Sequence, residues 1–104
     1  MDTEDYNSIV KPIELIGDPW TLLIIKSLLS GPKRFNELKN EVPGINNRTL
    51  SARLKSLAID GAIQRQVGLE NPPAVKYYLT PLGKGIGPIL KAIENFGNKF
   101  INES

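Results

Sequence analysis

The chain has 104 residues, a formal net charge of +2 and 40% hydrophobic residues, which suits one soluble globular domain. It contains no cysteine and no histidine, which excludes disulfides, thiolate nucleophiles, imidazole bases and the usual zinc and haem ligands. The glutamates are scattered without a visible catalytic pair, so we predict a binding protein without a cofactor, not an enzyme. No apolar run approaches the roughly 18 residues of a membrane helix, and the acidic start does not resemble a secretory signal. We therefore expect a cytoplasmic protein that makes no membrane contact.

The hydrophobic pattern predicts a chain of mostly helical elements. In order, these are a helix, an apolar helix, an edge strand, a short helix, a turn, a helix, a hairpin and a last helix, over residues 8–16, 20–30, 33–35, 36–42, 43–44, 46–60, 63–79 and 80 onward. Residues 1–6 are expected to fray. Asp18 should cap the second helix, with Pro19 at its first position. That helix is apolar on nearly every side, so we place it in the middle of the fold.

The second half of the chain predicts a helix followed by a β-hairpin. Asn46 is a good helix N-cap and Gly61 is expected to end the same helix in a left-handed conformation. Two strand-like runs, 63–69 and 75–79, flank a loop that contains Pro72 and Pro73, and the edge strand is expected to pair with this hairpin. The predicted fold class is therefore mainly α with a small antiparallel hairpin (α+β), a winged helix-turn-helix that forms one domain over residues 1–104.

Residues 46–60 form an amphipathic helix with an unusual outward face. On a helical wheel, its inward side is predicted to carry Leu50, Leu54, Leu57 and Ala58. The opposite side carries Arg48, Thr49, Ala52, Lys55, Ser56 and Ile59, with Ser51 and Arg53 flanking it. Arg and Asn side chains can each hold a base edge with two hydrogen bonds, and Thr and Ala fit a thymine methyl. This chemistry suits the DNA major groove, which the second helix of a helix-turn-helix enters.

Charge is distributed unevenly along the chain. Residues 1–25 carry five acidic side chains and one basic, whereas residues 26–76 carry nine basic and four acidic. Solvation explains any single cation equally well, but the set in this fold favours DNA contact. We predict that the DNA contacts are made by Lys33, Arg34, Asn46, Asn47, Arg48, Thr49, Ser51, Ala52, Arg53, Lys55, Arg65 and Lys76.

With these residues in view, the chain resembles the HxlR-type transcriptional regulators, which are relatives of the MarR winged helices. The matching stretches are LIGDPWTLLII (15–25), GPKRFNEL (31–38), PGINNRTLSARLKSL (43–57), DGAIQR (60–65) and PPAVKYYLTPLGKGIGPIL (72–90). The resemblance implies a homodimeric DNA-binding regulator whose recognition helix starts at Asn46 and whose wing spans the Pro72-Pro73 loop. It implies DNA contacts at Asn47, Arg48, Thr49 and Arg53.

Two positions depart from the family pattern. Many members carry a cysteine ahead of the first helix, where this chain has Asn7, so thiol-based sensing is excluded here. Lys76 stands where the family often has an acid, which makes this wing more basic. An unidentified small-molecule effector, bound between the wing and the dimer helices, is compatible with the sequence.

The last helix carries a long apolar stripe, which we interpret as a dimer surface shared with the first helix. Pro88 is expected to bend or break this helix. The alternative is that the stripe folds back on the chain's own core. The predicted dimer residues are Ile9, Ile13, Ile86, Ile89, Leu90, Ile93, Phe96 and Phe100. A two-fold dimer would read a pseudo-palindromic operator with its recognition helices about 34 Å apart.

One other function remains open. Winged helices also serve as protein–protein interaction modules that do not read DNA sequence. The basic, acid-free face of the predicted recognition helix favours DNA, because a protein-binding module need not keep it.

Overall fold

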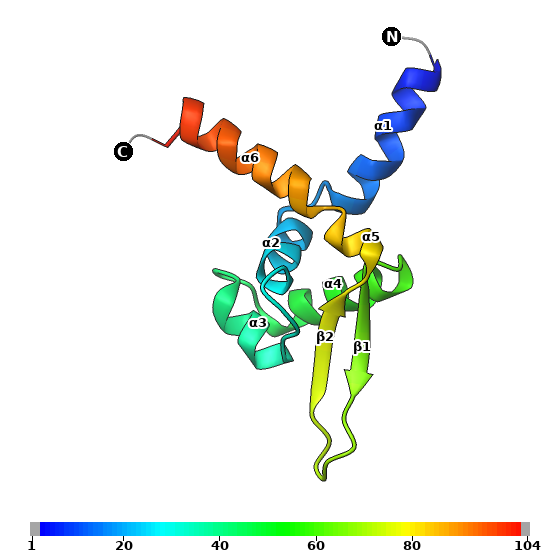
Figure 1. The fold of residues 1–104 in the computed structure, drawn as a ribbon, viewed down its shortest axis with the longest axis vertical. Coiled ribbons are helices and arrows are strands. Elements are labelled where there is room, and N and C mark those ends of the chain that lie inside the picture. The colour runs from blue at the N-terminus through cyan, green and yellow to red at the C-terminus, as the bar shows by residue number, and fades with distance from the viewer. Residues whose placement is uncertain (1–2, 103–104) are drawn as a thin grey trace.

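The computed structural model describes residues 3–102 and shows a winged helix-turn-helix, as the sequence predicts (Figure 1). The hairpin and the helices between the first and the last form a body, from which the first and last helices project as two arms. In chain order the elements are α1 (Thr3–Ile16), α2 (Pro19–Leu28), α3 (Phe35–Glu41), α4 (Asn47–Ile59), β1 (Ile63–Val67), β2 (Val75–Leu79), α5 (Pro81–Lys84) and α6 (Gly87–Phe100). None of the described helices combines the length and hydropathy needed to span a membrane.

Helix α2 lies at the centre of the body, as its apolar sequence predicts. Ile24 and Ile25 are fully buried, and α2 contacts α1, α3, α4, α6 and β2. Together with these two residues, the hydrophobic core consists of Leu28, Leu38, Val42, Ile45, Leu50, Leu54, Leu57, Ala62, Ile63, Leu79, Ile86 and Leu90. Burial of apolar side chains is the main favourable term in folding, so α2 is the element on which the others are assembled.

The predicted helix caps are confirmed. Asp18 accepts a hydrogen bond from the Thr21 amide at 3.0 Å, and Asn46 accepts one from the Thr49 amide at 2.7 Å. Each cap satisfies an amide that has no partner within its helix. Gly61 follows α4 with φ of 81°, the left-handed conformation expected at that end. These local signals fix where α2 and α4 begin and where α4 ends.

Helix α1 begins at Thr3, earlier than the predicted start at residue 8. Residues 3–6 were expected to be frayed, and this expectation was wrong, whereas residues 1–2 lie outside the described residues. The helical pattern therefore extends through a segment whose polar composition suggested a loose end.

The sheet has two strands, β1 and β2, paired antiparallel with Ile63 opposite Leu79 and Val67 opposite Val75. The predicted edge strand is reduced to one bridge, in which Lys33 and Tyr77 exchange backbone hydrogen bonds of 2.9 and 2.7 Å. Pro32 has no amide to donate, and α3 starts at Phe35, so no room is left for a longer ladder. The predicted pairing of this segment with the hairpin is therefore confirmed, but it is limited to one bridge and does not form a third strand.

The predicted final helix is broken into α5 and α6 by Gly85 and Ile86. Pro88 lies in the first turn of α6, where its missing amide costs nothing, and it cannot continue the hydrogen-bond ladder of α5. The break lets α5 pack at the base of the wing while α6 runs outward from the body (Figure 1).

The central role of α2 gives a first prediction. Ile24→Ala should lower the free energy of unfolding by about 2–5 kcal/mol, because it removes a fully buried side chain and leaves a cavity. Ile59→Ala is the control, since Ile59 is 76% exposed and its truncation should change the free energy by less than about 0.5 kcal/mol. Urea unfolding measures both, and equal losses in the two variants would contradict the assignment of the core.

Candidate nucleic-acid interface

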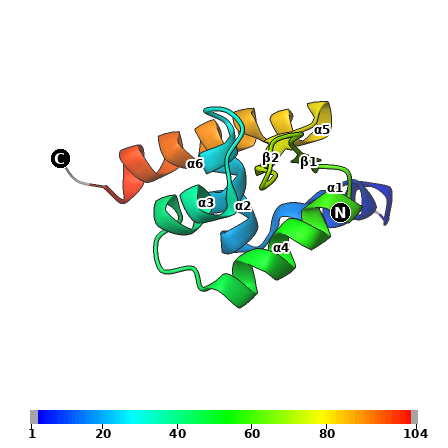
Figure 2. The same cartoon turned by 90° about the horizontal axis from the view of Figure 1, so that it is seen from below.

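Helix α4 lies across the side of the body that Figure 2 shows, with nothing covering it in that view. Leu50, Leu54 and Leu57 are buried, and α4 packs on α2 and β1. Ala58, which the helical wheel placed on the inward side, is exposed, so that prediction was wrong. The inward side is narrower than predicted because three leucines at helical spacing suffice to fill the contact.

The opposite side of α4 presents hydrogen-bonding groups to solvent. Asn47, Arg48, Ser51, Ala52 and Lys55 are exposed, and Thr49 is half-buried. The helix contains no acidic residue, and its N-terminal end carries the positive end of the helix dipole. The side chain of Asn46 is exposed, but its oxygen is already used by the cap. The exposed face is therefore positive and rich in donors, as required to approach DNA.

Arg53 differs from this set because it is bound to another helix. Its Nε donates to Asp18 Oδ2 at 2.5 Å and a terminal nitrogen lies 3.4 Å from Asp18 Oδ1. The same carboxylate caps α2 and accepts from the Thr21 hydroxyl at 3.0 Å. The Arg53 guanidinium thus joins α4 to the start of α2 in the unbound chain, and DNA contact by Arg53 stays a prediction.

The Asp18–Arg53 pair shifts the pKa of both groups. The hydrogen bond from Arg53 is the largest cause that lowers the pKa of Asp18, with further lowering by the Thr21 amide and hydroxyl and an opposing effect of burial. The hydrogen bond to Asp18 likewise raises the pKa of Arg53. The charged forms of both residues are thus favoured in the folded chain, and the pair contributes to holding α4 against α2.

Lys33 is also engaged inside the body. Its Nζ lies 3.3 Å from Glu41 Oε2 and donates to the Ser30 hydroxyl at 2.8 Å, and the side chain is only 13% exposed. Glu41 also accepts from the Ser27 hydroxyl, and this hydrogen bond is the largest cause that lowers the pKa of Glu41. This ammonium thus joins the end of α2 to α3, and a contact of Lys33 with the DNA backbone stays a prediction.

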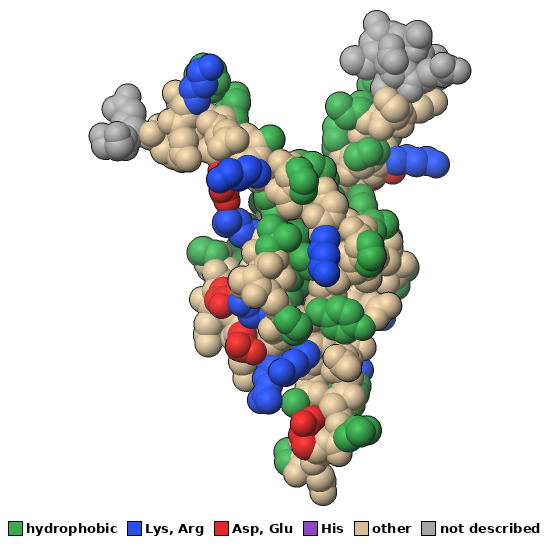
Figure 3. Space-filling view, viewed as in Figure 1, with side chains coloured by type: hydrophobic (Ala, Val, Ile, Leu, Met, Phe, Trp, Pro, Cys, Tyr) green, Lys and Arg blue, Asp and Glu red, His purple; other side chains and the backbone are tan. Residues whose placement is uncertain are grey.

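The remaining predicted cations lie on the wing and at the start of α3. Arg65 on β1, Lys76 on β2 and Arg34 before α3 are all exposed. Figure 3 shows basic side chains gathered where the wing leaves the body. Arg65 and Lys55 both line a shallow groove of about 360 Å³ between α4 and the wing. The structure thus brings Lys55 and Arg65, two residues predicted to contact DNA from separate elements, to one groove beside α4.

The predicted dimer residues divide into two groups. Six are exposed on the arms: Ile9, Ile13, Ile89, Ile93, Phe96 and Phe100. Ile86 and Leu90, in contrast, are 4% and 7% exposed and belong to the core of the chain itself. Their assignment to the dimer surface is corrected, because the start of α6 packs on α2 before the helix leaves the body.

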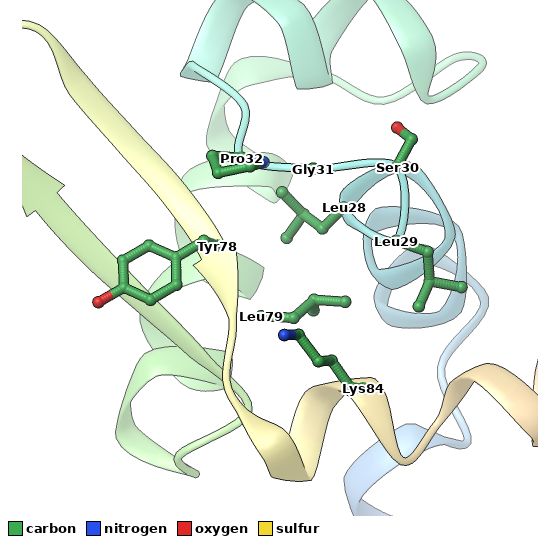
Figure 4. Close-up of a pocket in the computed structure, with 8 residues that line it drawn as sticks. All are labelled: Leu28, Leu29, Ser30, Gly31, Pro32, Tyr78, Leu79 and Lys84. Atoms are coloured by element: carbon green, nitrogen blue, oxygen red, sulfur yellow. The ribbon is translucent and has the colours of Figure 1, made fainter.

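A pocket of about 450 Å³ lies between the end of α2, β2 and α5 (Figure 4). Leu28, Leu79 and Pro32 give it apolar walls, and the Lys84 ammonium reaches in from α5. It lies beside the wing, close to the region between the wing and the dimer helices where the sequence is compatible with a bound effector. Within residues 3–102, no group of three or more acidic, His or Cys residues is arranged to hold a metal ion.

Sequence reasoning missed the two polar links made by Asp18 and Glu41. Asp18 was identified as a cap, and its second role is invisible in the sequence because Arg53 is 35 positions away. Lys33 precedes α3 and Glu41 is the last residue of that helix, so no helical spacing in the sequence reveals their contact. The ion pairs of Arg53 and Lys33 were therefore not visible in the sequence.

The double role of Asp18 leads to a prediction about stability and pH. Asp18→Asn keeps the cap but removes the charge, so it should lower the free energy of unfolding by about 0.5–1 kcal/mol at pH 7. The pKa of Asp18 is lower in the folded chain than in the unfolded one. The contribution of the pair is therefore complete above the unfolded pKa and lost as the pH falls through the folded pKa.

Urea unfolding at a series of pH values measures the difference between the parent and Asp18→Asn. The gap should be widest near neutral pH and should close in acid. Glu14→Gln is the control, because Glu14 is exposed on α1 and makes no ion pair within residues 3–102. A gap that stays constant at all pH values would contradict the role of the Asp18 charge.

The fold and the positive face of α4 agree with comparisons to known proteins. Residues 15–104 match the HxlR-like helix-turn-helix family. An HTH-type transcriptional regulator of Bacillus subtilis, YvaP, is 36% identical over 94 residues, which cover 90% of this chain and 87% of YvaP. A regulator of Methanothermobacter thermautotrophicus is 36% identical over 99 residues, covering 95% and 76% of the two chains.

Solved structures show the same relationship. A MarR-family regulator from Porphyromonas gingivalis superimposes with a TM-score of 0.84 at 38% identity, over 89% of this chain and 91% of the other. The redox regulator HypR in its oxidised form gives a TM-score of 0.84 at 31% identity, over 93% and 98%. The chain therefore belongs to the HxlR-like helix-turn-helix family and is a DNA-binding transcriptional regulator, not an enzyme.

Proposed function

We propose that the protein acts as a homodimer that binds a pseudo-palindromic operator in double-stranded DNA. Helix α4, with its cap at Asn46, enters the major groove, and the wing, residues 63–79, lies on the backbone or minor groove. The observation that carries this proposal is the exposed, acid-free face of α4, with its leucines anchored on the opposite side. We also propose a cytoplasmic location, because a transcriptional regulator must reach the chromosome.

Base contacts and backbone contacts fall to different residues in this arrangement. Asn47, Arg48, Ser51 and Ala52 lie on the exposed face near the start of α4, the part that reaches base edges in helix-turn-helix proteins. Lys55 lies farther along the helix, beside the wing. Cations on the wing contact phosphates, which position the protein without reading sequence. Arg53 and Lys33 support the body instead, because both are paired with acids.

The dimer proposal is supported by the two arms. Helix α6 carries Ile93, Phe96 and Phe100 exposed, and the rings of the two phenylalanines lie 5.3 Å apart. Ile9 and Ile13 are exposed on α1. Apolar patches of this kind on a soluble protein mark interaction sites. The arms leave the body away from the wing (Figure 1), so a pair of chains joined through them leaves both copies of α4 free for DNA.

The absence of cysteine limits how this regulator can be controlled. HypR is described as a redox regulator, and its structure is known in oxidised and reduced forms. This chain contains no cysteine, so any sensing by it uses noncovalent contacts or another residue type.

The alternative function is that of a protein-interaction module that does not read DNA. A salt titration separates this function from DNA binding, because DNA affinity falls steeply with salt.

The assignment of the reading helix is tested with Arg48. Arg48→Ala should weaken binding to the operator by about 1–3 kcal/mol and relax the sequence preference, because a two-pronged contact to a base edge is lost. The operator is first obtained by selecting bound duplexes from a random pool with the parent protein. Fluorescence anisotropy then compares the operator with a scrambled duplex.

Two further variants make this test specific. Lys76→Ala should weaken the operator and the scrambled duplex alike, because it removes a phosphate contact. Lys84→Ala is the matched control: its ammonium extends into the pocket between α2 and β2 and it should leave both affinities unchanged (Figure 4). Parental operator affinity in Arg48→Ala would show that α4 does not read DNA.

The dimer surface is tested by placing charge on an arm. Ile93→Glu should convert the dimer to a monomer and weaken operator binding, because a carboxylate cannot be buried between apolar helices without a partner. Sedimentation velocity measures the assembly. Leu69→Glu is the control, since Leu69 is fully exposed at the wing tip, far along the chain from both arms, and should leave the assembly unchanged. A dimeric Ile93→Glu would place the interface elsewhere.

A further inference from the structure

A small hollow of about 240 Å³ opens between the wing and the start of α3. Arg34 reaches it from the body, and Gln66 and Lys76, paired across the hairpin, reach it from the wing. Within residues 3–102, neither Arg34 nor Lys76 makes an ion pair within 4.0 Å. The structure thus brings two unpaired cations and an amide, all distant in sequence, to one open site.

The same hollow contains a carboxylate, that of Glu70 in the wing loop. Glu70 Oε1 accepts a hydrogen bond from the Ala74 amide at 3.1 Å, so the side chain folds back over the loop. Gly68 makes this fold possible, because a Cβ at that position would lie only 1.6 Å from Glu70 Oε1. The carboxylate is therefore directed into the hollow by a specific backbone arrangement.

The charges of both cations of the hollow also act on the Glu70 carboxylate. The hydrogen bond from the Ala74 amide is the largest cause that lowers the pKa of Glu70, and the charges of Arg34 and Lys76 lower it further. The ionised form of the carboxylate is therefore favoured, and it lies where Arg34 and Lys76 attract negatively charged oxygen atoms. In the free protein, the Glu70 carboxylate occupies this position. A DNA phosphate also carries negatively charged oxygen atoms and would be attracted to the same place.

We propose that this hollow is a seat for a DNA backbone phosphate between Arg34 and Lys76, and that Glu70 is a built-in competitor for that seat. The proposal rests on the proposed DNA binding. A phosphate that approaches the two cations meets the negative charge of Glu70, which weakens their attraction for it. Glu70 therefore lowers the affinity for all duplexes and leaves sequence preference unchanged, since phosphate contacts carry no sequence information.

Glu70→Gln tests the competitor role, because glutamine keeps the oxygen that accepts from Ala74 while removing the charge. Glu14→Gln on α1 is the matched control, with the same change in net charge far from the hollow in sequence. Anisotropy titrations use a labelled mixed-sequence duplex at several salt concentrations. Glu70→Gln should bind roughly two- to fivefold more tightly than the parent, the range expected for one exposed charge pair, and Glu14→Gln should bind like the parent.

A second pair of variants shows whether the gain belongs to the hollow. Arg34→Ala should weaken binding and lower the steepness of the salt dependence by about one unit, as one phosphate contact is lost. In the Arg34→Ala background, Glu70→Gln should give clearly less gain than in the parent, because one side of the seat is missing. An equal gain in both backgrounds would show a general charge effect and overturn the seat.

The remaining outcomes separate this proposal from the function on which it rests. If the parent binds the duplex in a salt-dependent way but Glu70→Gln binds no more tightly, Glu70 is only a loop support and the competitor is overturned while DNA binding stands. An equal gain in Glu14→Gln has the same consequence. If the parent does not bind duplex DNA at all, the proposed function fails, and the phosphate seat fails with it.

Discussion

The burial of α2 is the constraint on which the rest of the molecule depends. Its apolar residues recur on most sides of the helix, so α1, α3, α4, β2 and α6 all find a hydrophobic contact on one central rod. Because α4 is held through Leu50, Leu54 and Leu57, apolar packing sets which side of the helix faces the body. Most of its polar side chains consequently face solvent. The face of α4 that we propose to bind DNA is thus a product of the core, since a helix anchored on only one side leaves the other side available.

Polar links add precision to this hydrophobic arrangement, and they pair two of the predicted DNA-contacting cations with acids of the chain itself. Asp18 both begins α2 and holds Arg53 of α4, so the same carboxylate sets the start of one helix and the position of the other. Lys33 is used in the same way between the end of α2 and α3. A count of basic residues in the sequence therefore overstates the positive surface offered to DNA. Within residues 3–102, Arg48 and Lys55 make no ion pair within 4.0 Å.

The boundary between what could and could not be predicted follows the range of the interactions. The caps at Asp18 and Asn46, and the left-handed Gly61, were predictable because each depends on residues a few positions away. The winged fold followed from the order of such elements. The partners of Arg53 and Lys33, and the burial of Ile86 and Leu90, were not predictable, because they depend on which helices meet. In the stripe of α6, the residues that face α2 and those that face outward share one helical periodicity, so only the direction in which α6 leaves the body separates core from exposed surface.

The arms and the DNA-binding face are connected through the same central helix. Lys26 of α2 forms an ion pair of 2.6 Å with Glu94 of α6, and Asp18 follows directly after the Gly17 that ends α1. Gly17 cannot be replaced without strain, because a Cβ there would lie 2.4 Å from the Ile13 carbonyl oxygen. Both arms therefore join α2 through close contacts, and α4 is fixed to α2 by leucines and by Arg53. In the dimer that we propose, the spacing between the two copies of α4 therefore depends on the packing and ion pairs around α2.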